Sequence, residues 1–110
     1  MNDCIFCKIA NKEIPTKIVY ENEKIIAFND LNPQAPSHIL VIPKKHYSSL
    51  NEVEEKEILS ELLFSVKEIT KEKKIKDYRT VINTGKEAGQ AVFHIHLHIL
   101  SGREMLWPPG

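Results

Sequence analysis

The sequence predicts an α+β domain in which one long helix lies across an antiparallel sheet of about five strands. Three observations lead to this prediction. Short runs rich in β-branched residues are bounded by turn residues. One segment after residue 50 repeats large apolar residues at helical spacing. Near the carboxyl end, residues 94–100 alternate histidine with large apolar residues, which is typical of a strand with two different faces.

The first half of the chain is expected to contain a short helix and three strands. We expect a helical turn at residues 4–10 and strands at residues 17–20, 24–29 and 38–42. Residues 21–23 form the turn between the first two strands. Pro33 and Pro36 mark an irregular connection, and Pro43 ends the third strand because proline has no N–H to donate.

The main helix is expected from Leu50 to about Lys74. Its apolar stripe recurs at intervals of three or four residues and consists of Ile58, Leu59, Leu62, Leu63, Val66 and Ile69. Asn51, with Glu54 three residues later, resembles an N-terminal capping arrangement. Acidic residues crowd the first turns and lysines the last turns, which complements the helix dipole. We interpret these charges as a solvated helix face and not as a binding patch.

The last third of the chain is expected to supply two further strands and a glycine-containing loop. Residues 79–83 form the first of these strands, and residues 84–90 form the loop that leads toward the histidine strand at residues 94–100. The tail Trp107-Pro108-Pro109-Gly110 cannot form regular structure because of its prolines.

Composition bounds the possible functions. With 110 residues the chain has the size of one domain, which we place at residues 1–110. The formal net charge is zero, which argues against broad binding of nucleic acid or of a membrane surface. No apolar run approaches the ~20 residues that span a bilayer, and the polar start Met1-Asn2-Asp3-Cys4 lacks a secretory pattern. We therefore expect a cytoplasmic protein whose two cysteines stay reduced.

The alternating histidines His94, His96 and His98 are the strongest functional signal. In a strand their imidazoles share one face, while Ile95, Leu97 and Ile99 pack on the other. A metal site is the main alternative to catalysis, because residues i and i+2 can reach one ion. The first and last histidines are about 13 Å apart in an extended strand, at ~3.3 Å per residue. Zinc–nitrogen bonds of ~2.0–2.1 Å do not bridge that span, so the three histidines must divide their roles.

Imidazoles beside a glycine-containing loop suit phosphate chemistry. A neutral imidazole attacks phosphorus readily, and the resulting adduct hydrolyses readily. A second histidine can protonate the leaving group. Backbone N–H groups at residues 89–92 can cradle phosphate oxygens. The sequence has no Walker-type phosphate loop and no evident acidic magnesium cluster, so imidazoles and backbone amides would carry the reaction.

Cys4-Ile5-Phe6-Cys7 is a CxxC pair, which by itself has three interpretations. It is a redox pair, half of a zinc site, or two buried apolar cysteines. The absence of a following βαβ pattern disfavours a thioredoxin-like redox role. A tetrahedral zinc site needs two further ligands, and His46 and His94 are the candidates.

These motifs together resemble the histidine triad (HIT) family, whose signature is His-φ-His-φ-His-φ-φ with φ apolar. Residues 94–100 satisfy every position of that signature, and residues 14–18, 28–36 and 37–46 match further family segments. The terminal Trp-Pro-Pro-Gly is typical of the branch called histidine triad nucleotide-binding proteins. The resemblance covers nearly the whole chain. It implies a HIT-like fold with a short N-terminal helix, in a homodimer whose two sheets join into one continuous sheet.

The resemblance also implies an activity, namely hydrolysis of purine nucleoside 5′-monophosphoramidates of the AMP or GMP type. His96 would be the nucleophile and would form a nucleotidyl-histidine intermediate. His98 would lie at the α-phosphate and assist proton transfer, and His38 would belong to the supporting hydrogen-bond network. Many members have a serine where this chain has Ala91, so the preferred leaving group and the rate are expected to differ here.

The resemblance places a defined set of residues against the ligands. Asp30 would hold the ribose hydroxyls, an apolar group would wall the base, and a loop group would line the phosphate path. The full nucleotide set is Ile5, Phe6, Ile9, Phe28, Asp30, Leu31, Asn83, Gly89, Ala91, Val92, His96 and His98. Members with a CxxC pair bind a structural zinc that catalysis does not require, and its ligands here match Cys4, Cys7, His46 and His94.

Three other functions stay open from the sequence. The first is hydrolysis of dinucleoside polyphosphates, which another branch of the family performs. The second is nucleotide binding or a scaffold role with little turnover. The third is a metalloenzyme that uses the histidine row directly, in which case chelation would abolish catalysis while the fold remains intact.

Overall fold

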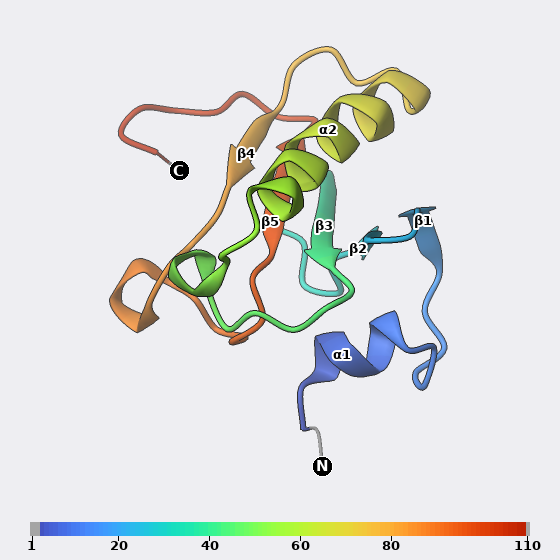
Figure 1. Cartoon of the computed structure of the whole chain (residues 1–110). Helices are drawn as coiled ribbons and strands as arrows, with labels where there is room; N and C mark the ends of the chain where they lie inside the picture. Colours follow the sequence, from blue (N-terminus) through green and yellow to red (C-terminus); the bar gives the residue numbers. More distant parts are fainter. Residues whose placement is uncertain (1–2, 110) are drawn as a thin grey trace.

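The computed structural model describes residues 3–109 and confirms the α+β fold (Figure 1). Five strands form one antiparallel sheet in the order β1-β2-β3-β5-β4. The strands are β1 (Ile18–Glu21), β2 (Ile25–Asn29), β3 (Ser37–Pro43), β4 (Arg79–Val81) and β5 (Leu97–Ser101). The helices are α1 (Ile5–Ala10) and α2 (Lys56–Glu72), with 3₁₀ turns at Leu50–Glu52 and Lys86–Ala88.

The two α-helices pack on different faces of the sheet. The stripe of α2 joins a large buried cluster with alternate residues of the central strands: Ile58, Leu62, Val66, Ile69, Ile25, Ala27, Ile39, Val41, Leu97 and Ile99. The other alternate residues face α1 in a smaller cluster of Phe6, Ile9, Ala10, Ile26, Phe28, Leu40 and Ile42. Figure 1 shows α2 lying across the sheet and α1 well apart from it, near the amino terminus. The period-2 alternation of the strands produces this separation.

The long helix begins later than the sequence predicts. Residues 50–52 form a separate 3₁₀ turn, Val53 is extended, and α2 starts at Lys56. The predicted cap of Asn51 with Glu54 is wrong, because the N-cap residue is Glu55 and its side chain makes no capping bond. Instead, the Glu55 carboxylate accepts hydrogen bonds from Lys45 Nζ and from the Tyr47 hydroxyl. These tertiary contacts override the local capping signal.

The histidine strand also begins later than predicted. Strand β5 starts at Leu97, and residues 91–96 before it are irregular. The N–H of Ile95 donates to the carbonyl of Tyr47 at 2.7 Å, outside the sheet ladder. The alternation nevertheless persists, since Ile95 is buried in the α2-side cluster while His96 and His98 face the other side. Strand β4 ends at Val81, two residues before the predicted end at Asn83.

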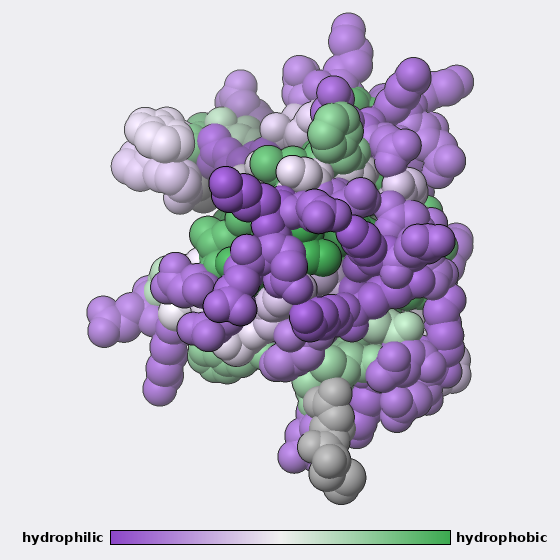
Figure 2. Space-filling model, viewed as in Figure 1, coloured by the Kyte–Doolittle hydropathy of each residue, from purple (hydrophilic) through white to green (hydrophobic). Residues whose placement is uncertain are grey.

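The surface and the tail add two observations. The face seen in Figure 2 is mainly hydrophilic, with apolar residues gathered in a recess near its centre. Among residues 3–109, no helix is long and apolar enough to cross a membrane. Residues 107–109 form a turn, as the prolines of the tail predict, while Met1, Asn2 and Gly110 lie outside the described residues.

Candidate functional site

The α1 face of the sheet contains a cavity of ≈ 820 Å³. Almost all of the residues predicted to contact a nucleotide line it: Ile5, Phe6, Ile9, Phe28, Asp30, Leu31, Gly89, Ala91, Val92, His96 and His98. His38 lines it as well. Asn83, which was also predicted, does not line the cavity. Its side chain lies beside Gly89, because a Cβ atom added at Gly89 would be 3.6 Å from Asn83 Nδ2.

One end of the cavity is apolar and aromatic. The rings of Phe6 and Phe28 pack edge to face with their centroids 5.6 Å apart. Ile9 is buried beside them, whereas Leu31 is 99% exposed at the surface. A flat heterocycle fits between apolar walls of this kind, because its faces lose little hydration there. Leu31 contributes a wall only when a ligand covers it.

His96 is fixed by a backbone carbonyl. Its Nδ1 lies 2.8 Å from the carbonyl oxygen of His94. A carbonyl oxygen only accepts, so Nδ1 donates the hydrogen bond and carries the proton of the neutral ring. The lone pair is therefore on Nε2. The ring is buried, lines the cavity, and packs edge to face with Phe6 at a centroid distance of 5.1 Å.

A chain of hydrogen bonds sets the tautomers of the other two histidines in the cavity. The N–H of Gln34 donates to His38 Nδ1 at 3.0 Å, so the His38 proton is on Nε2. That Nε2 donates to His98 Nδ1 at 2.8 Å. The neutral His98 ring then carries its proton on Nε2, which is buried without a partner in the described part of the chain. His98 thus holds a buried N–H donor, on a ring that lines the cavity.

Burial keeps these rings neutral near pH 7. It lowers the pKa of His98 to about 4, helped by the nearby rings of His96 and His38 and opposed by the Asp30 carboxylate. Burial also lowers the pKa of His38, with Asp30 opposing the shift. One carboxylate oxygen of Asp30 is 3.4 Å from His38 Nε2, and the other accepts the N–H of Asn32 at 2.8 Å. Asp30 therefore presents an acceptor to the same cavity.

The loop at residues 85–92 forms another wall, and Gln90 holds it in place. Gln90 is 3% exposed. Its Oε1 accepts the N–H of Gly85 at 2.9 Å, and its Nε2 donates to the carbonyls of Ser48 at 2.7 Å and Val92 at 3.1 Å. Gly89 has φ +98°, a left-handed conformation that favours glycine. Ala91 lines the cavity without a side-chain hydrogen-bonding group.

The predicted zinc ligands also come together. His94 Nδ1 lies 3.3 Å from Cys4 Sγ, 3.5 Å from Cys7 Sγ and 3.2 Å from His46 Nδ1. Tetrahedral zinc with bonds of ~2.0–2.3 Å separates its ligand atoms by roughly 3.3–3.8 Å. His94 Nε2 donates to the carbonyl of Pro43 at 2.8 Å, which leaves the Nδ1 lone pair directed at the cluster. The donors and their spacing fit a zinc ion.

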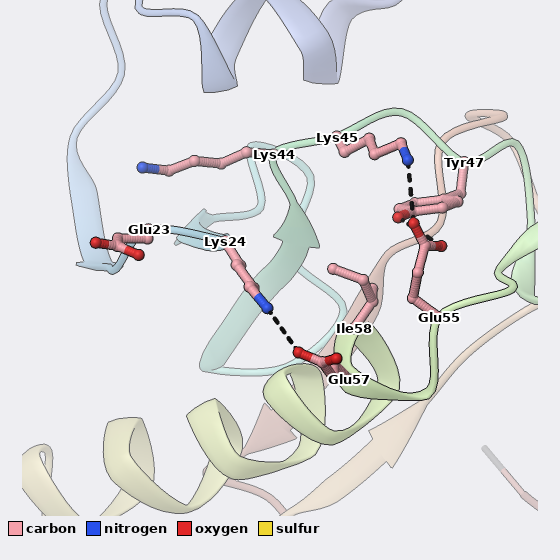
Figure 3. A pocket seen from close by; sticks show the side chains of 8 residues that line it. All are labelled: Glu23, Lys24, Lys44, Lys45, Tyr47, Glu55, Glu57 and Ile58. Atoms are coloured by element: carbon pink, nitrogen blue, oxygen red, sulfur yellow. Dashed lines mark hydrogen bonds and ion pairs between the residues drawn. The ribbon is translucent and has the colours of Figure 1, made fainter.

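A second cavity, of ≈ 400 Å³, lies between the strand ends and the start of α2 (Figure 3). Two ion pairs lie within it: Lys24 pairs with Glu57 at 3.1 Å, and Lys45 pairs with Glu55 at 3.1 Å. Lys44 binds Glu21 at 2.7 Å. Because its three lysines are each paired with a carboxylate, this cavity offers few free cations with which to recognise an anionic ligand.

Several residues of the site escape sequence reasoning. Gln34 and Pro43 act through backbone atoms, which leave no signal in a side-chain pattern. Gln90 stands in the predicted glycine loop, but its partner Ser48 is 42 residues away. Residues 14–17 also line the cavity, and no periodicity marks them. Only their membership of a recurring family segment singles them out.

Comparison with known proteins agrees with this geometry. Residues 11–105 match the model of the HIT domain. The chain is 52% identical to a 14 kDa zinc-binding protein of Zea mays, over 96% of this chain and 87% of the relative. It superposes on a HIT family hydrolase of Legionella pneumophila with TM-score 0.93 and 46% identity, covering 98% and 100% of the two chains. A histidine triad nucleotide-binding protein of Candida albicans superposes with TM-score 0.84 and 34% identity, covering 98% and 85%. The chain therefore belongs to the HIT domain family.

Proposed function

We propose that this protein is a nucleotide hydrolase of the histidine triad nucleotide-binding branch, which cleaves purine nucleoside 5′-phosphoramidates. One observation carries the proposal: the fixed tautomers put a lone pair on His96 Nε2 and an N–H without a partner among the described residues on His98 Nε2, on two rings that line the same cavity. A nucleophile beside a hydrogen-bond donor is what displacement at phosphorus needs. The names of the Legionella and Candida relatives support hydrolysis and nucleotide binding respectively.

The cavity suggests how a nucleotide binds. The purine lies against Phe6, Phe28 and their apolar neighbours, and Asp30 accepts hydrogen bonds from the ribose hydroxyls. The phosphate then reaches His96, His98 and the backbone of residues 89–92. Ala91 offers only its backbone to the phosphate. We therefore expect this protein to hold the leaving amine less tightly than a family member with a serine at this position.

The proposed reaction has two displacements. In the first, His96 Nε2 attacks phosphorus, a P–N bond forms, and the P–N bond to the amine breaks. A phosphate anion beside His98 stabilises its imidazolium, so the ring takes up a proton with the ligand. That proton enters at Nδ1, where the hydrogen bond from His38 Nε2 breaks, and the Nε2 proton passes to the departing nitrogen. In the second, water attacks phosphorus, neutral His98 accepts a water proton, and the bond to His96 breaks. The products are the amine and the nucleoside monophosphate.

Variants of His96 test this mechanism. A nucleoside 5′-phosphoramidate mixed with the wild type and quenched rapidly should give a covalent nucleotidyl adduct by mass spectrometry. His96→Ala should form no adduct and should lose more than about 10³-fold in kcat. Its thermal unfolding midpoint and its AMP affinity are the controls, and both should stay close to those of the wild type. Turnover by His96→Ala within tenfold of the wild type would overturn the proposal.

The same assay distinguishes the alternative substrates. A phosphoramidase has a higher kcat/KM for the phosphoramidate than for a diadenosine polyphosphate. The reverse order would identify a dinucleoside polyphosphate hydrolase. AMP binding with no turnover of either substrate would leave a binding or scaffold role.

We also propose that Cys4, Cys7, His46 and His94 hold a structural zinc ion. The fit of the donor atoms supports it, as does the name of the maize relative. Zinc in this place would tie the amino terminus to the segments after β3 and before β5. Chelation should lower the thermal unfolding midpoint. A chelated protein that loses turnover but keeps its midpoint would instead favour a catalytic metal.

We further propose that two copies of the chain form a homodimer with one continuous sheet. We also place the protein in the cytoplasm. Strand β4 is an edge strand, so its outer backbone groups can pair with a second copy. In the same strand, Arg79 Nη1 is buried with no partner among residues 3–109. Sedimentation equilibrium should give twice the chain mass of 12.7 kDa. A mass of one chain would contradict the dimer.

A further inference from the structure

Helix α1 belongs to both of the proposed ligand sites. Cys4, its N-cap residue, and Cys7, in its first turn, supply two donors to the Cys4, Cys7, His46 and His94 group, which we call the donor cluster. Ile5, Phe6 and Ile9 of the same helix line the nucleotide cavity. Any ion that fixes the two sulfur atoms therefore fixes the helix that forms the apolar wall.

The helix has little intrinsic stability. It has only six residues, which is far below the ~12–15 that an isolated helix needs to be even marginally stable. Its buried side chains contribute to the smaller of the two core clusters, in which Phe6 and Ile9 also face the cavity. The position of α1 thus depends on the contacts of Cys4 and Cys7 at its start and of its buried side chains.

Phe6 joins the two sites directly. Its ring packs edge to face against His94 of the donor cluster at a centroid distance of 5.9 Å. It makes the same kind of contact with His96 at 5.1 Å and with Phe28 of the apolar wall at 5.6 Å. One buried ring therefore touches a metal donor, the proposed nucleophile and the base wall.

His94 provides a second connection. Its Nδ1 faces the sulfur atoms, while its backbone carbonyl accepts the hydrogen bond that orients His96. His94 is completely buried, and its Nε2 is held by the Pro43 carbonyl. An ion bound at Nδ1 restrains this ring and, through the carbonyl, the ring of His96.

We infer that zinc in the donor cluster and a purine nucleotide in the cavity bind cooperatively, with Phe6 as the positioning residue that couples them. The inference rests on the proposed nucleotide site. Zinc orders α1 in advance, so the nucleotide no longer has to order it. Thermodynamic linkage then requires that a bound nucleotide raise the affinity for zinc by the same factor.

The test measures a binding cycle and needs no turnover. With the thiols kept reduced, calorimetry gives the Kd of AMP for zinc-loaded and zinc-free protein, and chelator competition gives the Kd of zinc with and without AMP. We expect AMP to bind about 5- to 150-fold more tightly with zinc, the usual range of such coupling, and zinc to gain by the same factor. A factor of one in both directions would overturn the inference.

Variants of Phe6 locate the coupling. Phe6→Ala should reduce the coupling factor between AMP and zinc toward one. Phe6→Leu keeps most of the apolar volume and should reduce the factor partly, so it replaces the alanine variant if that variant unfolds. Phe64→Ala is the matched control, since Phe64 is an exposed phenylalanine on α2 that lines neither site. Undiminished coupling in both Phe6 variants would contradict the role of Phe6. Failure of AMP to bind either form would instead refute the proposed function.

Discussion

The two faces of the sheet bury their side chains against helices of very different kinds. On one face, the 17-residue α2 packs side chains such as Leu62, which is 1% exposed, into the large apolar cluster. On the other, the six-residue α1 packs Phe6, which is 6% exposed, beside a cavity of ≈ 820 Å³. The histidines and the donor cluster lie on the second face. The larger apolar cluster therefore lies on the α2 face, and the proposed chemistry lies on the α1 face.

This division has a physical reason. A cavity that admits a ligand leaves apolar surface unburied, and the histidines that line it need hydrogen-bond partners that a close-packed apolar core does not offer. A helix as short as α1 can form one wall of a cavity only if contacts outside the helix hold it in place.

The largest expected effect on stability comes from the α2 face. Leu62→Ala should lower the free energy of unfolding by about 2–5 kcal/mol, because it leaves a cavity in a core that packs closely. Leu63→Ala, at an exposed neighbouring position, should change it by no more than about 0.5 kcal/mol. Denaturant unfolding measures both values. AMP affinity of the folded Leu62→Ala protein should be unchanged, and a weaker affinity would show that the two faces are not independent.

A smaller loss of stability is expected at the loop on the α1 face. Gln90→Met removes three hydrogen bonds and leaves buried backbone groups unpaired, which should cost about 1–3 kcal/mol. It should also weaken AMP binding, because residues 89–92 lose their anchor. Gln34→Met is the control for stability alone, since its exposed side chain makes one bond and its backbone contacts to His38 and Arg103 remain. Equal stability of the two variants would refute the anchoring role of Gln90.

Acid should destabilise the folded protein through the buried histidines of the α1 face. The pKa of His98 is lowered to about 4 from its ordinary 6.5, so between these pH values the unfolded chain binds a proton that the folded chain does not. The free energy of unfolding should therefore fall as pH drops from 6.5 toward 4. Burial lowers the pKa of His38, and lowers that of His94 to about 4, which adds to this fall. Denaturant unfolding of zinc-free protein should show a shallower pH dependence in His98→Gln, whereas an unchanged dependence would contradict the assignment.

The smallest effect is expected at the second cavity. The ion pair between Lys24 and Glu57 is exposed, so water and salt screen it. A double-mutant cycle of Lys24→Ala and Glu57→Ala should give a coupling energy near the limit of measurement that disappears at high salt. A strong coupling that persists in salt would mean that this cavity contributes more than its exposed charges suggest.

Local sequence patterns were sufficient for the α2 face. Ile58, Leu62, Val66 and Ile69 follow the helical period, and all four are buried in the predicted direction. The alternation of residues 94–99 also held, even though His94 and His96 precede strand β5. Side-chain alternation in an extended chain requires only extended backbone and not a hydrogen-bonded ladder. The sequence therefore predicts an element well when its side chains follow a single helical or two-residue period along its whole length.

The α1 face was predictable in its residues but not in its contacts. The spacing of Cys4 and Cys7 leaves open a redox pair, half of a zinc site and two buried apolar cysteines, and the proximity of His46 and His94 favours the proposed zinc site. The start of α2 was missed because Lys45 and Tyr47 bind the side chain of Glu55. The tautomers depend on carbonyls and N–H groups of Gln34, Pro43 and His94, which no side-chain pattern encodes.

Hydrogen exchange measured by mass spectrometry, with and without AMP and zinc, tests the division between the two faces most directly. We predict that AMP slows exchange most in α1 and in residues 85–96, that zinc slows exchange most in α1, and that α2 is slowed only by as much as each ligand raises the global free energy of unfolding. Slower exchange in α2 on addition of AMP, with α1 unchanged, would contradict the division of stability and chemistry between the two faces.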